Sequence, residues 1–257
     1  MSTTPVYFAG IDIGSTASKT VVLKDGKIED YFVLPTGWNG RETANAILEQ
    51  LKTRGYADAM RCVATGYGRI CVDYADKIVT EITCHGKGGW AIFKKNMTII
   101  DVGGQDTKMI KVIDGQVADF LMNDKCAAGT GRFLEMMAKT LGLSLEEMSV
   151  KGLEWKHNIV ISSMCTVFAE SEVISLIADN HTDSDIIHGL NQSIAGKTAA
   201  MAARAKGQPP YMMTGGVARN RGVVQALEEK LGAKLFISEN PDLCGALGAA
   251  LFALHGD

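Results

Sequence analysis

The sequence lacks the features that mark several large classes of protein. Its longest apolar runs fall far short of the ~20 residues that a membrane-spanning helix needs. Its formal net charge of −3 comes without any block of basic residues. The opening segment "MSTTPVYFAGIDIG" shows neither the charged region nor the cleavage site of a secretory signal. We therefore expect a cytoplasmic protein that has neither a membrane nor a nucleic acid as a partner.

Closely spaced cysteine pairs are also missing. The six cysteines are spread along the chain, and none forms the CxxC pair typical of a metal site made by one chain. In a cytoplasmic protein they should be reduced thiols or metal ligands instead of disulfides. The histidines lack metal-ligand spacing too, and we expect surface or helix-capping positions for all of them: His85, His157, His181, His188 and His255.

What the chain does have is an internal repeat. Residues 12–28, "DIGSTASKTVVLKDGKI", align without a gap with residues 101–117, "DVGGQDTKMIKVIDGQV". Each copy follows a β-like run, and the Asp-Gly pair inside each copy predicts a tight hairpin turn. With 257 residues, of which 46% are hydrophobic, the chain is long and apolar enough for two such units. We expect two similar domains, each opening with a β-hairpin that carries Asp-x-Gly at its bend.

The two bends have the chemistry of a phosphate site. Glycine lets backbone N–H groups approach an anion closely, and Ser15 and Thr16 add hydroxyl groups. Asp12 and Asp101 would face each other across a cleft and hold a hydrated Mg²⁺, with the phosphates between the two hairpins. A duplicated hairpin without a ligand is the alternative that the residues leave open.

These segments resemble the actin, Hsp70 and sugar-kinase ATPases over nearly the whole chain. "DIGSTASK" and "DVGGQDTK" look like their two phosphate loops, and "MTGGVARN" at 213–220 looks like their adenosine loop. "TEITCHGKGG" at 80–89 and "CGALGAALFAL" at 244–254 look like their connecting helices. The resemblance implies an α/β fold of two ribonuclease-H-like domains around a nucleotide cleft. It divides the chain into a first domain (1–95), a second domain (96–243) and a C-terminal helix (244–257) at the domain interface.

The resemblance also implies roles for individual residues. Glu81 or Gln105 would position the attacking water, and Asp101 would take part in catalysis. The residues for ATP and Mg²⁺ would be Asp12, Gly14, Ser15, Thr16, Lys19, Asp101, Gly103, Gly104, Gln105, Gly215 and Gly216.

Two cysteines stand immediately before segments that are predicted to be helical. Cys126 lies in "NDKCAAGTGRF" and Cys165 in "ISSMCTVFAESEVISLIA", where the apolar spacing favours helices. A helix N-terminus favours an anion such as a thiolate. A [4Fe–4S] cluster needs four cysteines, which a two-fold dimer supplies with two from each chain. From the residues alone, ordinary buried thiols or a zinc site remain alternatives.

A longer resemblance bears on these cysteines. "DIGSTASK", "ATGYGR", "IDVGGQD", "MNDKCAAGTGRF", "CTVFAESEVIS" and "TGGVA" together look like the activator component of 2-hydroxyacyl-CoA dehydratases, within the BadF/BadG/BcrA/BcrD-type ATPases. The broader family includes activators of benzoyl-CoA reductase.

This resemblance implies a homodimeric ATPase with one [4Fe–4S] cluster shared through Cys126 and Cys165 of both chains. Reduced ferredoxin or flavodoxin would supply an electron, and ATP hydrolysis would drive its transfer to the dehydratase. An activator of a benzoyl-CoA-reductase-type protein, a sugar or small-molecule kinase, and an actin-type assembly ATPase are the alternatives.

Overall fold

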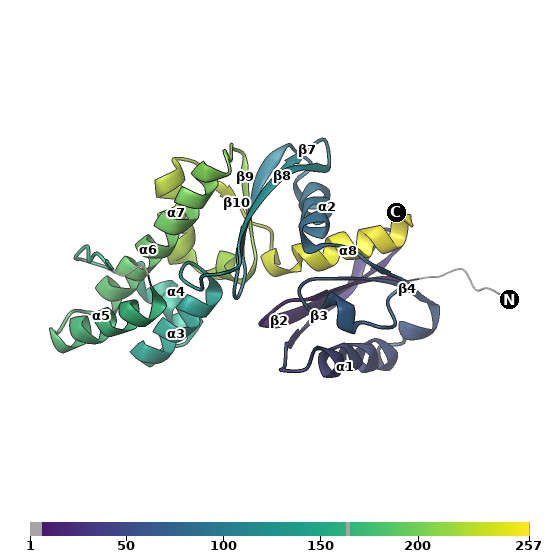
Figure 1. Cartoon of the computed structure of the whole chain (residues 1–257), viewed down its shortest axis with the longest axis horizontal. Coiled ribbons are helices and arrows are strands. Elements are labelled where there is room, and N and C mark those ends of the chain that lie inside the picture. Colours follow the sequence, from purple (N-terminus) through teal and green to yellow (C-terminus); the bar gives the residue numbers. More distant parts are fainter. Residues whose placement is uncertain (1–6, 163–164, 257) are drawn as a thin grey trace. The chain divides into compact units, whose positions relative to one another are not determined.

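The computed structural model describes residues 7–162 and 165–256 (Figure 1). The chain forms two compact units: the first contains residues 1–96, 110–119 and 242–257, and the second contains residues 97–109 and 120–241. No helix among the described residues is long and apolar enough to cross a membrane.

Two five-stranded sheets share one strand order. The first runs β3-β2-β1-β4-β5 and the second runs β8-β7-β6-β9-β10. In the first sheet, β1–β2 and β2–β3 are antiparallel, whereas β1–β4 and β4–β5 are parallel. The strands are β1 (Tyr7–Ile13), β2 (Ala17–Lys24), β3 (Lys27–Pro35), β4 (Met60–Thr65), β5 (Lys77–Ile78), β6 (Met97–Val102), β7 (Thr107–Ile113), β8 (Gln116–Asn123), β9 (Tyr211–Thr214) and β10 (Leu235–Phe236). This common order confirms the α/β fold with a duplicated hairpin unit.

The predicted hairpin turns form at the two Asp-Gly pairs. Asp25 and Gly26 have φ of 52° and 74°, and Asp114 and Gly115 have φ of 50° and 79°. A two-residue turn with positive φ at both positions matches the twist of the strands that it joins. Short polar Asp followed by Gly tolerates this conformation better than other pairs do.

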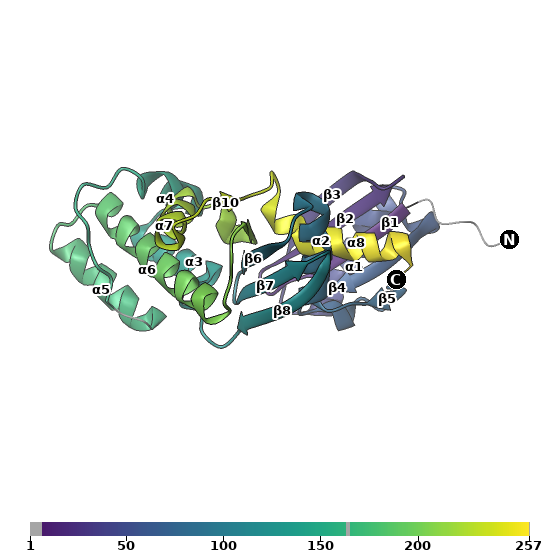
Figure 2. The ribbon, with the colours of Figure 1, turned by 90° about the horizontal axis from the view of Figure 1, so that it is seen from above.

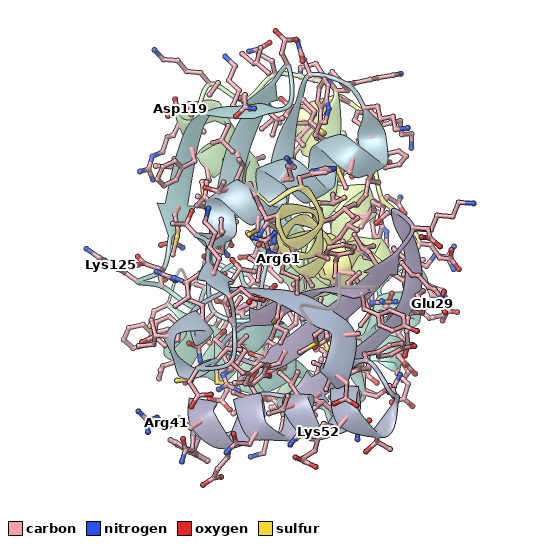
Figure 3. All side chains as sticks on the ribbon, turned by 90° about the vertical axis from the view of Figure 1, so that its right-hand side faces the viewer. Glu29, Arg41, Lys52, Arg61, Asp119 and Lys125 are labelled. Carbon is pink, nitrogen blue, oxygen red and sulfur yellow. The ribbon has the colours of Figure 1, made fainter. Side chains whose placement is uncertain are left out.

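Among the described residues, the α-helices of the first unit are α1 (Gly40–Thr53), α2 (Glu81–Phe93) and α8 (Cys244–His255). The side chain of Asn39 caps α1, which buries Ile47 and Leu51 while Arg41 and Lys52 project outward (Figure 3). Helices α2 and α8 lie together (Figure 2). They can approach closely because Gly88 and Gly248 have no side chains. A Cβ at either position would collide with the backbone of the other helix.

In the part of the chain that the structure describes, the α-helices of the second unit are α3 (Gly131–Leu141), α4 (Leu145–Lys151), α5 (Thr166–Ala178), α6 (Asp183–Arg204) and α7 (Arg221–Leu231). Short 3₁₀ helices lie at Ala57–Ala59, Arg69–Cys71, Gly216–Arg219 and Pro241–Leu243. A single hydrophobic cluster joins strands β6 and β9 to α3, α6 and α7. It includes Phe133, Leu190 and Met213, each of which is fully buried. This cluster supports the end of β6, where Asp101 lies.

Candidate nucleotide and thiol sites

The first Asp-x-Gly bend joins β1 to β2. Asp12 and Lys19 are partners across the two strands, and their charged groups lie 3.7 Å apart. The N–H of Gly14 donates to the carbonyl of Ala17 and closes the bend. The hydroxyl of Thr16 is buried and has no hydrogen-bond partner among the described residues. A buried hydroxyl without a partner is costly, and a phosphate oxygen would supply one.

The "ATGYGR" segment packs against this bend. A side chain at Gly66 would meet the Asp12 carboxylate and the carbonyl of Ile13, so only glycine fits there. The N–H of Gly68 donates to the same carbonyl at 2.9 Å, and Arg69 donates to the carbonyl of Gly66 at 2.9 Å. Arg69 therefore holds the segment that encloses Asp12.

Helices α2 and α8 bring His85 close to Asp12. The position that a Cβ would take on Gly245 lies 2.8 Å from His85 Cε1 and 2.9 Å from Asp12 Oδ2. His85 Nδ1 lies 2.9 Å from the carbonyl oxygen of Glu81, one helical turn earlier. Because a carbonyl oxygen only accepts, this nitrogen carries the proton. Glu81 itself is half-buried at the start of α2.

Two of the five histidines differ from the expected surface or capping positions. His85 is buried because the face of α2 that carries it packs against α8. His188 is buried on α6 and stacks on Trp155 with ring centroids 3.9 Å apart. His157, His181 and His255 are exposed, as predicted. Periodicity could have indicated His85, since it lies three residues before Gly88 and four before Gly89, on the face of the helix that carries small residues.

The second bend holds a more deeply buried charge. The Asp101 carboxylate, at the end of β6, accepts a hydrogen bond from Thr214 at 2.8 Å and one from Lys108 at 3.2 Å. Lys108 also lies 2.8 Å from Asp106, and only 4% of the side chains of Asp101 and Lys108 is exposed. The ammonium therefore balances the charge of a buried carboxylate. The sequence repeat had aligned Lys108 with Lys19 but assigned no role to it.

The predicted adenosine loop closes against Asp101. Gly215 follows β9 with φ of +85°, and a Cβ on it would collide with the Val102 carbonyl and lie 3.1 Å from Asp101 Oδ1. Gly216 has open space around it. Gln105 is exposed at the bend between β6 and β7. Asp101, Gly103, Gly104, Gln105 and Gly215 thus surround one bend of the second unit.

The first turn of α3 is hydrogen-bonded to this bend. The N–H of Gly131 donates to the carbonyl of Gly103, and the N–H of Arg132 donates to the carbonyl of Gly104, both at 2.8 Å. These are N–H groups that have no acceptor within their own helix. The Thr107 hydroxyl adds a bond to the carbonyl of Gly129 at 3.2 Å. A displacement of the bend would therefore act directly on α3.

Two cysteines differ from the others in their surroundings. Cys126 and Cys165 are exposed, whereas Cys62, Cys84 and Cys244 are buried. Burial raises the pKa of both Cys62 and Cys84 to about 12, which makes them inert thiols. Among the described residues, no three potential ligand side chains are grouped so that one chain could hold a metal ion.

The predicted helix after Cys165 is confirmed, because Cys165 is the N-cap of α5. Its buried residues are Ala169 and Val173, while Val167, Phe168, Ile174 and Ile177, the apolar residues that predicted the helix, are exposed.

The expectation that a helix starts just after Cys126 is wrong. Helix α3 begins at Gly131 and its N-cap is Thr130. The intervening residues form a turn in which Gly129 has φ of +97°. Helical backbone cannot pass through a residue with that φ. Cys126 therefore lies on a loop, and its neighbour Lys125 points outward (Figure 3).

The two five-stranded sheets share one strand order and each carries an Asp-x-Gly bend, so the chain is an α/β protein built on a duplicated hairpin unit. The chain belongs to the BadF/BadG/BcrA/BcrD ATPase family, which matches residues 9–253. It is an ATP-binding ATPase of that family.

Similar proteins include two bacterial relatives. The chain is 44% identical over 254 residues to the 2-hydroxyisocaproyl-CoA dehydratase activator of Clostridioides difficile, covering 96% of this chain and 95% of the relative. It is 44% identical over 254 residues to the (R)-2-hydroxyglutaryl-CoA dehydratase activating ATPase of Acidaminococcus fermentans, with coverage of 96% and 97%. A solved structure of the Clostridium difficile activator with bound ADPNP superposes with a TM-score of 0.92 at 41% identity, covering 97% of this chain and 95% of that one.

Proposed function

We propose that this protein is the ATP-dependent activator of a 2-hydroxyacyl-CoA dehydratase, working as a homodimer with one [4Fe–4S] cluster. The observation that carries the proposal is the identity of 44% to dehydratase activators over 96% of the chain. The division into domains 1–95 and 96–243 with a C-terminal helix 244–257 belongs to the same proposal.

The thiols fit half of a cluster site. Cys126 and Cys165 are the two cysteines of the six that are exposed, and one chain offers no third ligand beside them among the described residues. A cluster with four cysteine ligands would need both again from a second chain. When bound, the cluster would supply a one-electron carrier of low potential, with ferredoxin or flavodoxin as the donor and the dehydratase as the acceptor.

The residues of the two bends would bind the nucleotide. Asp12 and Asp101 would hold a hydrated Mg²⁺ from opposite phosphate loops. Gly103 and Gly104 of the second bend and the residues of the first bend would hold the phosphates. In the first bend these are Gly14, Ser15 and Thr16, with Lys19 beside them. Gly215 and Gly216 would line the adenosine pocket, and Glu81 or Gln105 would orient the attacking water.

Coupling to the thiols would run through α3. Its first N–H groups are hydrogen-bonded to the carbonyls of Gly103 and Gly104. Phosphate binding and release at that bend would shift these carbonyls and with them the turn that follows Cys126. Nucleotide-linked movement of one packed element against another is a common coupling device.

The test is activation of a dehydratase in a defined mixture. Protein purified without oxygen is analysed for iron and sulfide per dimer and then mixed with the dehydratase, a reductant and either ATP or ADP. We expect one four-iron cluster per dimer. We expect dehydration in the mixture with ATP and none in the mixture with ADP. Iron-free protein that phosphorylates a sugar or another small molecule would refute the proposal in favour of the kinase alternative.

A further inference from the structure

One lysine lies where the loop of Cys126 meets the long helix of the second unit. Lys197 is the single lysine of α6. Its Cβ and Cδ each lie 3.5 Å from the position that a Cβ would take on Gly129, three residues after Cys126. The lysine stem thus packs against the turn that carries this cysteine.

The ammonium group of Lys197 lies over the ring of Phe133, in the first turn of α3. Its Nζ lies 5.4 Å from the ring centroid of Phe133, which is fully buried. A cation over an aromatic face is attracted by the ring quadrupole, and more strongly when water is excluded. The side chain is half-buried, so its charge is only partly screened by solvent.

Both exposed thiols act on this ammonium. Burial lowers the pKa of Lys197, whereas the charges of Cys126 and Cys165 raise it. Helix α5, whose N-cap is Cys165, packs on α3, which follows Cys126, and on α6, which carries Lys197 (Figure 1). Lys197 therefore connects the two cysteine segments, which are far apart in the sequence.

We propose that Lys197 is a positioning residue for the cluster ligands, whose positive charge holds the two thiolates together and makes the cluster easier to reduce. The inference rests on the proposed function. A cluster held by four thiolates is an anion and gains one further negative charge on reduction. A nearby cation stabilises the reduced form more than the oxidised form, which raises the reduction potential. A homodimer would place one Lys197 on each side.

A packing role for the lysine stem makes a different prediction. If the stem only fills the space between Gly129 and Phe133, an uncharged chain of similar length should replace it without effect. Lys197→Met keeps most of the stem and removes the charge, while Lys197→Arg keeps the charge and changes the shape. Lys139→Met is the matched control, because Lys139 is an exposed lysine in the last turn of α3.

The experiment measures iron content and the midpoint reduction potential of the four proteins, purified without oxygen, in a titration followed by EPR. We expect equal potentials for wild type, Lys197→Arg and Lys139→Met, and a more negative potential for Lys197→Met. An unchanged potential in Lys197→Met with full iron would overturn the inference and leave the proposed function standing. Equal shifts in Lys197→Met and Lys197→Arg would also overturn it.

Loss of iron is informative as well. If Lys197→Met loses iron and Lys197→Arg keeps it, the positive charge is needed to hold the thiolates, which supports the inference. If both lose iron equally, the role of the side chain is packing and the inference fails. Iron-free wild-type protein would refute the proposed function and this inference together.

Discussion

Exchanging Asp12 or Asp101, the aspartates of the two bends, for asparagine should lower the turnover of ATP in both cases. The two changes should differ in how much they lower the free energy of unfolding. In Asp101→Asn, the Lys108 ammonium loses the buried carboxylate at 3.2 Å and keeps Asp106 at 2.8 Å. Weakening one of two charged hydrogen bonds in a site that is 4% exposed should cost about 1–3 kcal/mol of unfolding free energy. The Thr214 hydroxyl can still donate to the amide oxygen, so the fold should survive.

Asp12→Asn should cost less stability. Asp12 and Lys19 lie 3.7 Å apart, beyond hydrogen-bond distance, and 17% of the Lys19 side chain is exposed. Removing such an ion pair should cost about 0–1 kcal/mol. Turnover should fall greatly in both variants, because each removes a carboxylate proposed to hold Mg²⁺.

The assay combines urea unfolding of the nucleotide-free protein with steady-state ATP hydrolysis. Asp73→Asn, at an exposed carboxylate, is the control and should change neither quantity. Equal losses of stability for Asp12→Asn and Asp101→Asn would refute the reasoning from burial. Normal hydrolysis by both variants would refute the two-bend nucleotide site.

Three further predictions concern single positions. Cys126→Ser and Cys165→Ser should each abolish bound iron while ATP binding persists, because each change removes two ligands from a dimer; Cys71→Ser, at a half-exposed thiol, should keep its iron. Gly215→Ala should weaken ATP binding and destabilise the protein by at least about 1–2 kcal/mol in urea unfolding, because its φ of +85° is unfavourable for alanine. Hydrogen bonds from the N–H groups of His157 and Lys156 lower the pKa of Asp185 from 3.8 to about 2. The stabilising effect of the Asp185 carboxylate is therefore complete above about pH 5 and is lost as the pH falls from about 5 to about 2. The stability difference between wild type and Asp185→Asn should therefore shrink between pH 5 and pH 2, and a constant difference would contradict this assignment.

The hairpins could be predicted from the sequence because their determinants are local. Asp-Gly turns, alternating strands and the gap-free repeat all act within a few residues. The sheets follow from the same repeat, because β1 and β6 are the first strands of the two copies and are the central strands of two sheets with the same strand order.

The start of α3 could not be predicted in this way. Its first N–H groups find their acceptors on Gly103 and Gly104, nearly thirty residues earlier in the chain. A prediction from neighbouring residues alone expects a cap for those N–H groups within the same segment. The predicted helix therefore began too early, just after Cys126. The burial of His85 likewise depends on α8, which is distant in sequence. Asp101, which pairs with Lys108, also accepts a hydrogen bond from Thr214 of the distant strand β9.

This long-range capping of α3 bears on how tightly the proposed sites can be coupled. The bend at Gly103 and Gly104 and the turn ahead of α3 belong to the same unit and share direct backbone hydrogen bonds. A shift of the bend by even part of a hydrogen-bond length would break these bonds unless the turn moved with it, because such bonds weaken steeply with distance and angle. The proposed route from the bend at Gly103 and Gly104 to Cys126 therefore lies within the second unit, whereas Asp12 belongs to the first unit. Perturbations at Asp101 should consequently reach the environment of Cys126 in the isolated nucleotide-free protein, and those at Asp12 should do so only when nucleotide is bound.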